Sequence, residues 1–158
     1  MDIPIIEHVK SQAQVLVPLV KALQAELGEE RANAIVRKAL GDLYREFGEE
    51  WWRSRGSHNL GDNMASAFRK FAAGDALDYE VIKQTPDAHE INVTRCRYAE
   101  FYKALGASEL GFLLTCTADF NLAEGYGSDV RLLRTQTIME GASHCDFRYA
   151  LEKKENGP

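Results

Sequence analysis

Long apolar runs and clusters of positive charge are both missing from this sequence of 158 residues. No run approaches the roughly 20 apolar residues of a membrane-spanning helix, and the first ten residues lack the basic start and apolar stretch of a signal peptide. Lys and Arg number 19 against 24 Asp and Glu, which gives a net charge of −5. Surfaces that bind nucleic acid or anionic membranes need clustered Lys and Arg, so we expect neither partner. We expect a cytoplasmic protein with a small-molecule substrate.

Cysteine is also scarce, and its spacing contains no close pair. The three cysteines are Cys96, Cys116 and Cys145. Structural zinc sites usually contain a pair such as C-x2–4-C, so we predict no metal and no cofactor, although three thiols and Asp119 could in principle coordinate zinc. Thiols in a reducing compartment stay free for packing or for chemistry.

The first half of the chain is predicted to be helical. Apolar residues recur at helical spacing over Ile5–Leu27 and over Glu29–Trp52. Pro18 lacks a backbone donor and is expected to kink or restart the first helix. Gly28 and Gly56 are expected to end the two helices.

The second half changes to strand periodicity. A loop over Arg55–Asn63 and a short helix over Met64–Ala73 come first. Four segments are predicted to be strands: Tyr79–Gln84, Glu90–Tyr98, Val130–Met139 and His144–Glu152. Two helices, Ala99–Leu105 and Ser108 to about Asn121, are predicted between the second and the third strand. We predict an α+β fold in which N-terminal helices pack on a four-stranded antiparallel sheet in β-β-α-α-β-β order. Residues 1–152 are expected to form a single domain, and residues 153–158 a polar tail.

Polar side chains gather on faces that would otherwise be core. Asn92, Thr94, Cys96 and Tyr98 alternate onto one face of the predicted strand. A buried polar group without a partner costs about 1–3 kcal/mol, so such a face indicates a pocket. A single free cysteine is more often a small hydrophobic residue of the core than a reactive group.

Further polar residues come later in the chain. Cys116 and Asp119 are spaced i,i+3 and share a helix face. Arg134 and Gln136 share a face of the third predicted strand, and Asp146 directly follows Cys145.

These residues lie within a block that resembles a known family. The segments NVTRCRYAEFYKALGASELGFLLTCTADFNLAEGY (Asn92–Tyr126) and RTQTIMEGASHCDF (Arg134–Phe147) resemble the L-2-amino-thiazoline-4-carboxylate hydrolase family. The reaction for which that family is named opens a cyclic amidine with water to give N-carbamoyl-cysteine. The resemblance therefore implies a hydrolase acting on carbon–nitrogen bonds other than peptide bonds, in a cyclic amidine or amide.

The chemistry suggests roles for the residues. Cys116, Asp119 and Cys145 are the candidate catalytic residues, with a thiolate of lowered pKa as the favoured nucleophile and activated water as the alternative. A carboxylate suits the amidinium nitrogens or the water, and Arg134 suits a substrate carboxylate. The candidate substrate-binding residues are Asn92, Cys96, Tyr98, Arg134, Gln136 and Asp146.

Other classes of function remain open at this stage. The helix-plus-sheet pattern is also similar to the vinyl-reductase-type ligand-binding domains, which implies a non-catalytic binding or sensor module. A metal-dependent regulator subunit is a third reading. Trp51 and Trp52 lie on one predicted helix, where they could belong either to the hydrophobic core or to a contact between subunits. A homo-oligomer is therefore one expectation.

Overall fold

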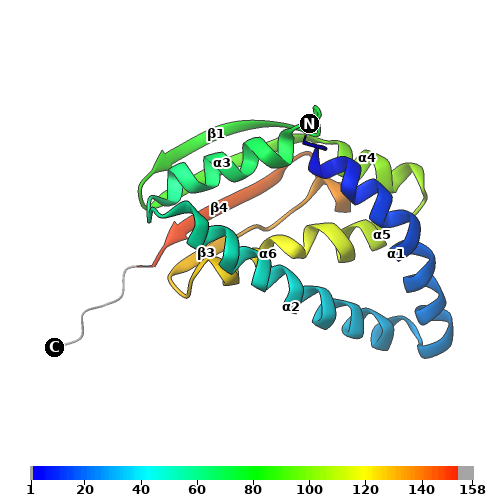
Figure 1. The fold of residues 1–158 in the computed structure, drawn as a ribbon. Coiled ribbons are helices and arrows are strands. Elements are labelled where there is room, and N and C mark those ends of the chain that lie inside the picture. The colour runs from blue at the N-terminus through cyan, green and yellow to red at the C-terminus, as the bar shows by residue number, and fades with distance from the viewer. Residues whose placement is uncertain (1, 153–158) are drawn as a thin grey trace.

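Helices cover one face of a four-stranded antiparallel sheet in the computed structural model, which describes residues 2–152 (Figure 1). The sheet has the order β1-β2-β4-β3, and every neighbouring pair is antiparallel. The elements along the chain are α1 (Ile5–Leu27), α2 (Glu29–Arg55), α3 (Leu60–Ala72), β1 (Leu77–Thr85), β2 (Ala88–Cys96), α4 (Arg97–Ala104), α5 (Ser108–Gly111), the π-helical segment η1 (Phe112–Cys116), α6 (Ala118–Tyr126), β3 (Val130–Leu133), the 3₁₀ turn η2 (Ile138–Glu140) and β4 (Cys145–Leu151). The predicted α+β class and antiparallel sheet are confirmed. The polar tail predicted at 153–158 lies outside the described residues.

The long N-terminal helices differ from their prediction in one respect. Pro18 lies inside α1, which continues through it. The buried face of α1 carries Ala13, Val17 and Val20 on both sides of the proline, and this packing stabilises the helix against the loss of one hydrogen bond.

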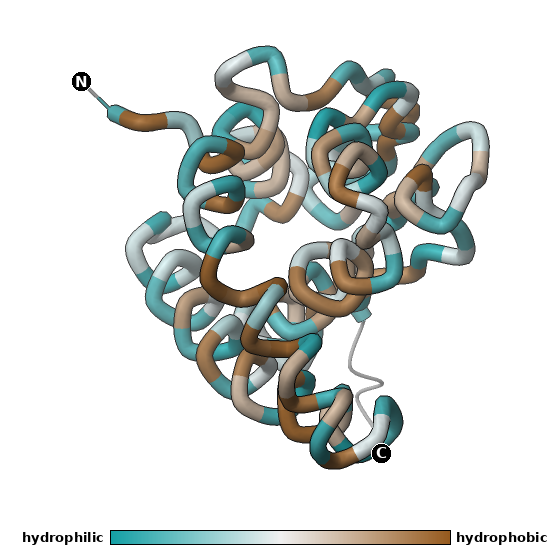
Figure 2. The backbone as a smooth tube through the Cα atoms, turned by 90° about the vertical axis from the view of Figure 1, so that its right-hand side faces the viewer, coloured by the Kyte–Doolittle hydropathy of each residue, from teal (hydrophilic) through white to brown (hydrophobic). Residues whose placement is uncertain are grey.

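Hydrophobic and hydrophilic segments alternate along the helices, as Figure 2 shows. Within residues 2–152, no helix is long and apolar enough to cross a membrane.

Helix α3 begins four residues before the predicted start at Met64. Asn59 is its N-cap, and the side chain of Asn59 accepts a hydrogen bond from the backbone N–H of Asp62 at 3.0 Å. Leu60 at the first turn is fully buried. The predicted loop is therefore confined to four residues, 56–59, because the cap and this apolar anchor extend the helix backwards.

Helices α2 and α6 pack with their backbones in close approach. A Cβ placed on Gly48 of α2 would lie 2.3 Å from the carbonyl oxygen of Leu122, and one on Gly125 of α6 would lie 2.1 Å from that of Arg45. Only glycine leaves room for backbones to approach this closely. The contact fixes the position of α6, which carries part of the site described below.

A π-helical segment interrupts the helical run between α5 and α6. The N–H of Thr117 donates to the carbonyl of Phe112 at 3.1 Å, five residues back, and the N–H of Phe120 donates to Thr117 at 3.3 Å. The carbonyl oxygen of Cys116 would accept from Phe120 in a regular α-helix. The π-helical turn leaves it available for another donor.

The sheet departs from regular alternation at β2. Tyr79 pairs with Val93 and Asp78 pairs with Arg95, so Thr94 is an extra residue on β2. Such a bulge inserts one residue and shifts the following side chains to the other face. Val93 and Cys96 therefore both face the helices, whereas a strand without a bulge would place them on opposite faces.

Candidate functional site

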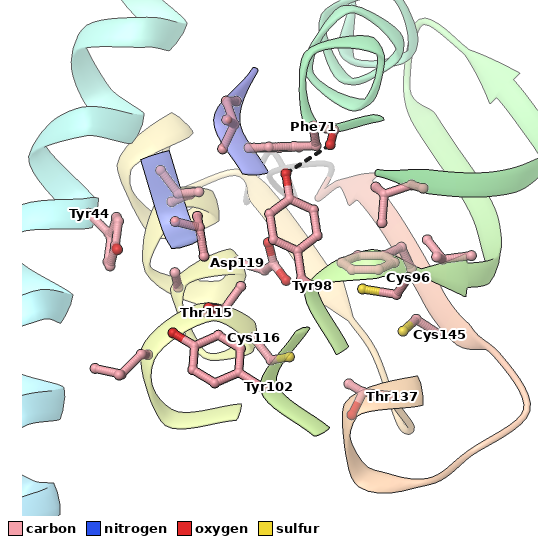
Figure 3. A pocket seen from close by; sticks show the side chains of 18 of the residues that line it. Tyr44, Phe71, Cys96, Tyr98, Tyr102, Thr115, Cys116, Asp119, Thr137 and Cys145 are labelled. Carbon is pink, nitrogen blue, oxygen red and sulfur yellow. Dashed lines mark hydrogen bonds between the residues drawn. The ribbon is translucent and has the colours of Figure 1, made fainter. Parts of the chain in front are cut away.

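A cavity of about 160 Å³ lies between the helices and the covered face of the sheet (Figure 3). Its wall takes residues from α1, α2, α3, α4, η1, α6 and strands β1, β2 and β4. The lining residues are Ile5, Val9, Gln12, Leu16, Tyr44, Phe68, Phe71, Leu77, Val93, Cys96, Tyr98, Tyr102, Leu114, Thr115, Cys116, Ala118, Asp119, Leu122, Arg134, Thr137, Cys145 and Phe147. The cavity surface is mostly apolar, and the polar side chains project from several elements, among them α1, α4, η1 and α6.

Six of the nine site residues predicted from the sequence line this cavity, namely Cys96, Tyr98, Cys116, Asp119, Arg134 and Cys145. Cys96 ends β2, Cys116 ends the π-helical segment and Cys145 begins β4. Figure 3 shows the three thiols around the same space. The structure thus brings together the three thiols, the aspartate and the arginine.

Asn92 and Asp146 are not among the lining residues, because they lie on the open face of the sheet. They are directly paired across β2 and β4, next to the inward pair Val93–Cys145. Asn92 Oδ1 accepts from Arg148 Nη2 at 2.9 Å. Side chains on a strand alternate, so the neighbour of an inward thiol points outward.

Gln136 is also outside the cavity wall, and the predicted third strand ends early, at Leu133. Asp146 accepts from the backbone N–H groups of Thr135 at 2.9 Å and Gln136 at 3.0 Å, and also from the Thr135 hydroxyl. These donors bind a side chain instead of a neighbouring strand, so the predicted strand Val130–Met139 stops. Gln136 Nε2 donates to the carbonyl of His144 at 2.9 Å.

Arg134 and Asp119 form an ion pair in the cavity wall. Arg134 Nη1 lies 2.7 Å from Asp119 Oδ2, and only 3% of the arginine side chain is exposed. The guanidinium also lies 4.8 Å from the ring centre of Phe120 and 5.4 Å from that of Phe147. Such contacts favour a buried guanidinium, which is planar and weakly hydrated.

Burial dominates the acidity of Asp119. It raises the pKa of this carboxyl group to about 6, and the charge and hydrogen bond of Arg134 act in the opposite direction. A buried carboxylate loses hydration, which disfavours its charged form, whereas a nearby cation favours it. Carboxyl groups with such a shift are often found at sites of proton transfer.

The pKa of each of the three thiols is raised, whereas an activated cysteine nucleophile has a lowered pKa. Burial raises the pKa of Cys96 to about 11, and burial together with the charge of Asp119 raises the pKa of Cys116 well above its usual value. Burial also raises the pKa of Cys145, although its Sγ accepts from the N–H of Ile138 at 3.2 Å. The lowered thiol pKa that a cysteine nucleophile requires is therefore not found at any of the three positions.

Several polar residues that line the cavity were not predicted as site residues from the sequence. Tyr44, Tyr102, Thr115 and Thr137 reach the cavity from α2, α4, η1 and the segment before η2 (Figure 3). Thr115 adjoins Cys116 in sequence, and Tyr44 lies within the apolar stripe of α2, which is a signal for burial and not for a site. The hydroxyl of Tyr98 donates to the carbonyl of Phe71 at 2.9 Å.

Metal coordination has no geometric support in the described part of the chain. No group of three or more His, Cys, Asp or Glu residues there is arranged to hold a metal ion. The cavity nevertheless contains thiols from three separate elements.

An α+β fold with a mostly apolar cavity and one buried ion pair in its wall is the class that this fold and site define. Residues 8–149 match the model of the family L-2-amino-thiazoline-4-carboxylic acid hydrolase, and the chain belongs to this family. The resemblance predicted from the sequence is confirmed, and it covers most of the chain.

No curated protein matches the sequence significantly. One solved structure with a similar arrangement is the phenol-responsive sensory domain of the transcription activator PoxR with phenol, at 14% identity and a TM-score of 0.48, covering 87% of this chain and 73% of that chain.

Proposed function

We propose that this protein is a hydrolase that opens a small cyclic amidine or amide ring inside the cavity, with Asp119 as the general base. The observation that carries the proposal is the environment of Asp119, a carboxylate with a pKa of about 6 beside a cavity of about 160 Å³. Such a group is ionised at neutral pH and is basic enough to take a proton from water. The name of the family supports the same reaction class.

The proposed step uses one water molecule. Asp119 takes a proton while the water oxygen bonds to carbon 2 of a 2-aminothiazoline ring, between the nitrogen and the sulfur. The electron pair of the carbon–nitrogen double bond moves to the ring nitrogen, which receives the second proton of the water. The electron pair of the carbon–sulfur bond then leaves with the sulfur, which takes up the proton held by Asp119, as the carbonyl of the urea forms. The product carries a urea group and a free thiol. In a cyclic amide, the carbon–nitrogen bond breaks in the same way, and the nitrogen takes the proton.

The remaining lining residues are assigned to binding in this proposal. Cys96, Cys116 and Cys145 shape the cavity as neutral thiols, because burial raises the pKa of each. Tyr98 is held by its bond to Phe71 and contributes a rigid aromatic wall. The nucleophilic role of Cys116, favoured by the sequence analysis, is the competing assignment.

The test is a ring-opening assay with a panel of cyclic amidines and lactams, followed by mass spectrometry and by titration of the released thiol. Asp119→Asn should lower the rate by about 10²–10⁴-fold, the range typical of a lost general base. Glu124→Gln is the matched control, because Glu124 is an exposed carboxylate on the same helix, paired with Arg45 at 2.9 Å. Asp119→Asn with wild-type turnover would contradict the role of Asp119.

A non-catalytic ligand-binding module is the second candidate. The observation in its favour is the composition of the wall, which is mostly apolar and contains no thiol of lowered pKa. Binding sites for small molecules are commonly built in this way. A protein that binds members of the panel without opening any of them would belong to this class.

A further inference from the structure

Three hydroxyl side chains line one side of the cavity and come from three different elements. Tyr44 lies on α2, Tyr102 on α4 and Thr115 on η1. Figure 3 shows these three side chains on the side of the cavity toward α2, with Cys96 and Cys145 on the opposite side. Tyr44, Tyr102 and Thr115 therefore form one polar end of the cavity, which we name the hydroxyl cluster.

The other hydroxyl groups of the cavity wall are bound by the protein itself. The hydroxyl of Tyr98 donates to the carbonyl of Phe71 at 2.9 Å, and that of Thr137 donates to Glu140 Oε1 at 2.9 Å. Within residues 2–152, no carbonyl or carboxylate binds the hydroxyl cluster in this way, and only His89 has buried polar side-chain atoms that lack a partner. The oxygens of the hydroxyl cluster are therefore accessible from the cavity, where a ligand can supply the hydrogen bonds that buried polar groups normally make.

The hydroxyl cluster offers both donors and acceptors without a formal charge. Burial raises the pKa of Tyr44 and of Tyr102, so both phenols stay protonated at neutral pH. A hydrogen bond from Thr115 to Tyr102 acts on the pKa of Tyr102 in the opposite direction. When Thr115 donates this bond, the O–H of Tyr102 remains a donor for a ligand, and the oxygen of Thr115 remains an acceptor.

The π-helical segment contributes to this end of the cavity. Leu114, Thr115 and Cys116 are consecutive residues of η1, and all three line the cavity. Irregular turns of this kind are frequently found at functional sites. The wall therefore gains the Thr115 hydroxyl at the point where the helix departs from regular geometry.

We infer that Tyr44, Tyr102 and Thr115 form a specificity subsite for the edge of the substrate ring that both donates and accepts hydrogen bonds, which is the N–C–N edge of a cyclic amidine or the N–C=O edge of a cyclic amide. The inference rests on the proposed function, because it takes this cavity as the substrate site. A carboxylate only accepts hydrogen bonds and so matches the mixed hydroxyl cluster less well. A substrate carboxylate has another partner in Arg134, whose Nε and Nη2 make no hydrogen bond to the described residues.

The test uses two aromatic probes that the proposed reaction does not open, 2-aminothiazole-4-carboxylate and 2-methylthiazole-4-carboxylate. The probes share the ring and the carboxylate, and only the first has an exocyclic group that donates N–H. In titration calorimetry on the full chain at neutral pH, the amino probe should bind about tenfold more tightly, which corresponds to one or two net hydrogen bonds. Tyr102→Phe and, independently, Thr115→Val should reduce this ratio to about threefold or less.

Two variants outside the cavity wall are matched controls. Tyr79 lies on β1, and the hydroxyl of Thr117 donates to the carbonyl of Leu113 at 2.6 Å. Tyr79→Phe and Thr117→Val should therefore keep the wild-type ratio of the two affinities. The unfolding midpoint of each variant is measured beside its affinities, and Tyr44→Phe tests the same subsite if Tyr102→Phe does not fold.

A wild-type ratio near one, or a tenfold ratio that persists in all the cavity variants, would overturn the inference, and so would the failure of both probes to bind. Ring opening is followed separately with cyclic amidines, so the two proposals can fail independently. Binding with the expected ratios but no ring opening would contradict the proposed function alone. Ring opening with a ratio that the variants do not change would contradict this inference alone.

Discussion

Arg134 and Asp119 are joined through a single nitrogen, Nη1 of the guanidinium, which also reaches the carbonyl oxygen of Cys116. The two hydrogens of Nη1 can thus serve one acceptor on α6 and one on the π-helical segment. Arg134 therefore fixes the carboxylate relative to the backbone and lowers its pKa against the effect of burial.

Removal of the Arg134 charge should shift the pH dependence of the reaction. Arg134→Gln should raise the pKa of Asp119 above about 6, because the charge of Arg134 would no longer oppose the effect of burial. The acidic limb of kcat/KM, where the rate rises as Asp119 loses its proton, should move to higher pH. Arg131→Gln is the control, since Arg131 is exposed and pairs with Glu152 at 2.5 Å. If the acidic limb of kcat/KM stays at the same pH in Arg134→Gln, Arg134 does not affect the ionisation that limits the rate, and the prediction is contradicted.

The thiol and carboxylate assignments make opposite predictions for Cys116→Ser. We expect this variant to keep most of its ring-opening activity, because burial holds the Cys116 thiol in its protonated form. Iodoacetamide should modify the folded protein slowly at neutral pH, as measured by mass spectrometry. Loss of turnover in Cys116→Ser with an unchanged unfolding midpoint would favour the nucleophile predicted from the sequence.

His89 should make the fold sensitive to acid. It is fully buried, its ring stacks on Phe68 at 5.8 Å, and both ring nitrogens lack a hydrogen-bond partner among the described residues. Burial lowers its pKa from the usual value near 6.5, so the unfolded state binds more protons below about pH 6.5. Stability from this residue is present above that pH and is lost as the pH falls.

The measurement is the unfolding free energy in denaturant at several pH values, compared between wild type and His89→Phe. The comparison isolates His89, because Asp119 acts with the opposite sign: its raised pKa makes the folded state bind more protons between about pH 4 and 6. The wild type should lose more stability than His89→Phe as the pH falls below about 6.5. His8→Phe, at an exposed position of α1, should behave like the wild type. Parallel curves for wild type and His89→Phe would contradict the prediction.

The close contact of α2 and α6 should be intolerant of a single methyl group. Gly48→Ala places a Cβ 2.3 Å from the carbonyl oxygen of Leu122, and the backbones must separate to relieve this contact. Overpacking of this kind costs about 1–3 kcal/mol, and calorimetry should show a lower unfolding midpoint. Gly41→Ala is the matched control on the same helix, because its Cβ would meet the movable end of Asn121 at 3.1 Å. An unfolding midpoint for Gly48→Ala equal to that of Gly41→Ala would show that the helices separate at little cost.

The sequence predicted the elements whose pattern is local. The spacing of Cys116 and Asp119 placed both on one helix face, and Gly28 and Gly56 marked the ends of α1 and α2. The family resemblance pointed to the C-terminal half of the chain, which supplies most of the polar residues that line the cavity. These features depend on periodicity or on residues close in sequence, which a single chain reveals.

The features that the sequence missed depend on contacts between distant segments. The bulge at Thr94 arises from pairing with β1 and moves Cys96 onto the inward face of β2. The end of β3 at Leu133 depends on Asp146, which binds the backbone of a segment eleven residues earlier. The raised pKa of each thiol depends on burial in a cavity wall that distant segments build, and the residues next to the thiols in the sequence do not indicate this burial.

The π-helical segment also has a consequence for how the chain can vary. A π-helical turn holds one residue more than an α-helical turn, so it is equivalent to a single-residue insertion in a regular helix. Deletion of one residue within Phe112–Cys116 would restore the α-helical register, and the flanking residues would keep nearly their present orientation, because the π-helical turn absorbs the extra residue. The carbonyl that now accepts from Arg134 would then be returned to the helix. In alignments with relatives, a one-residue gap at this segment would mark proteins in which the ion pair has lost its backbone acceptor.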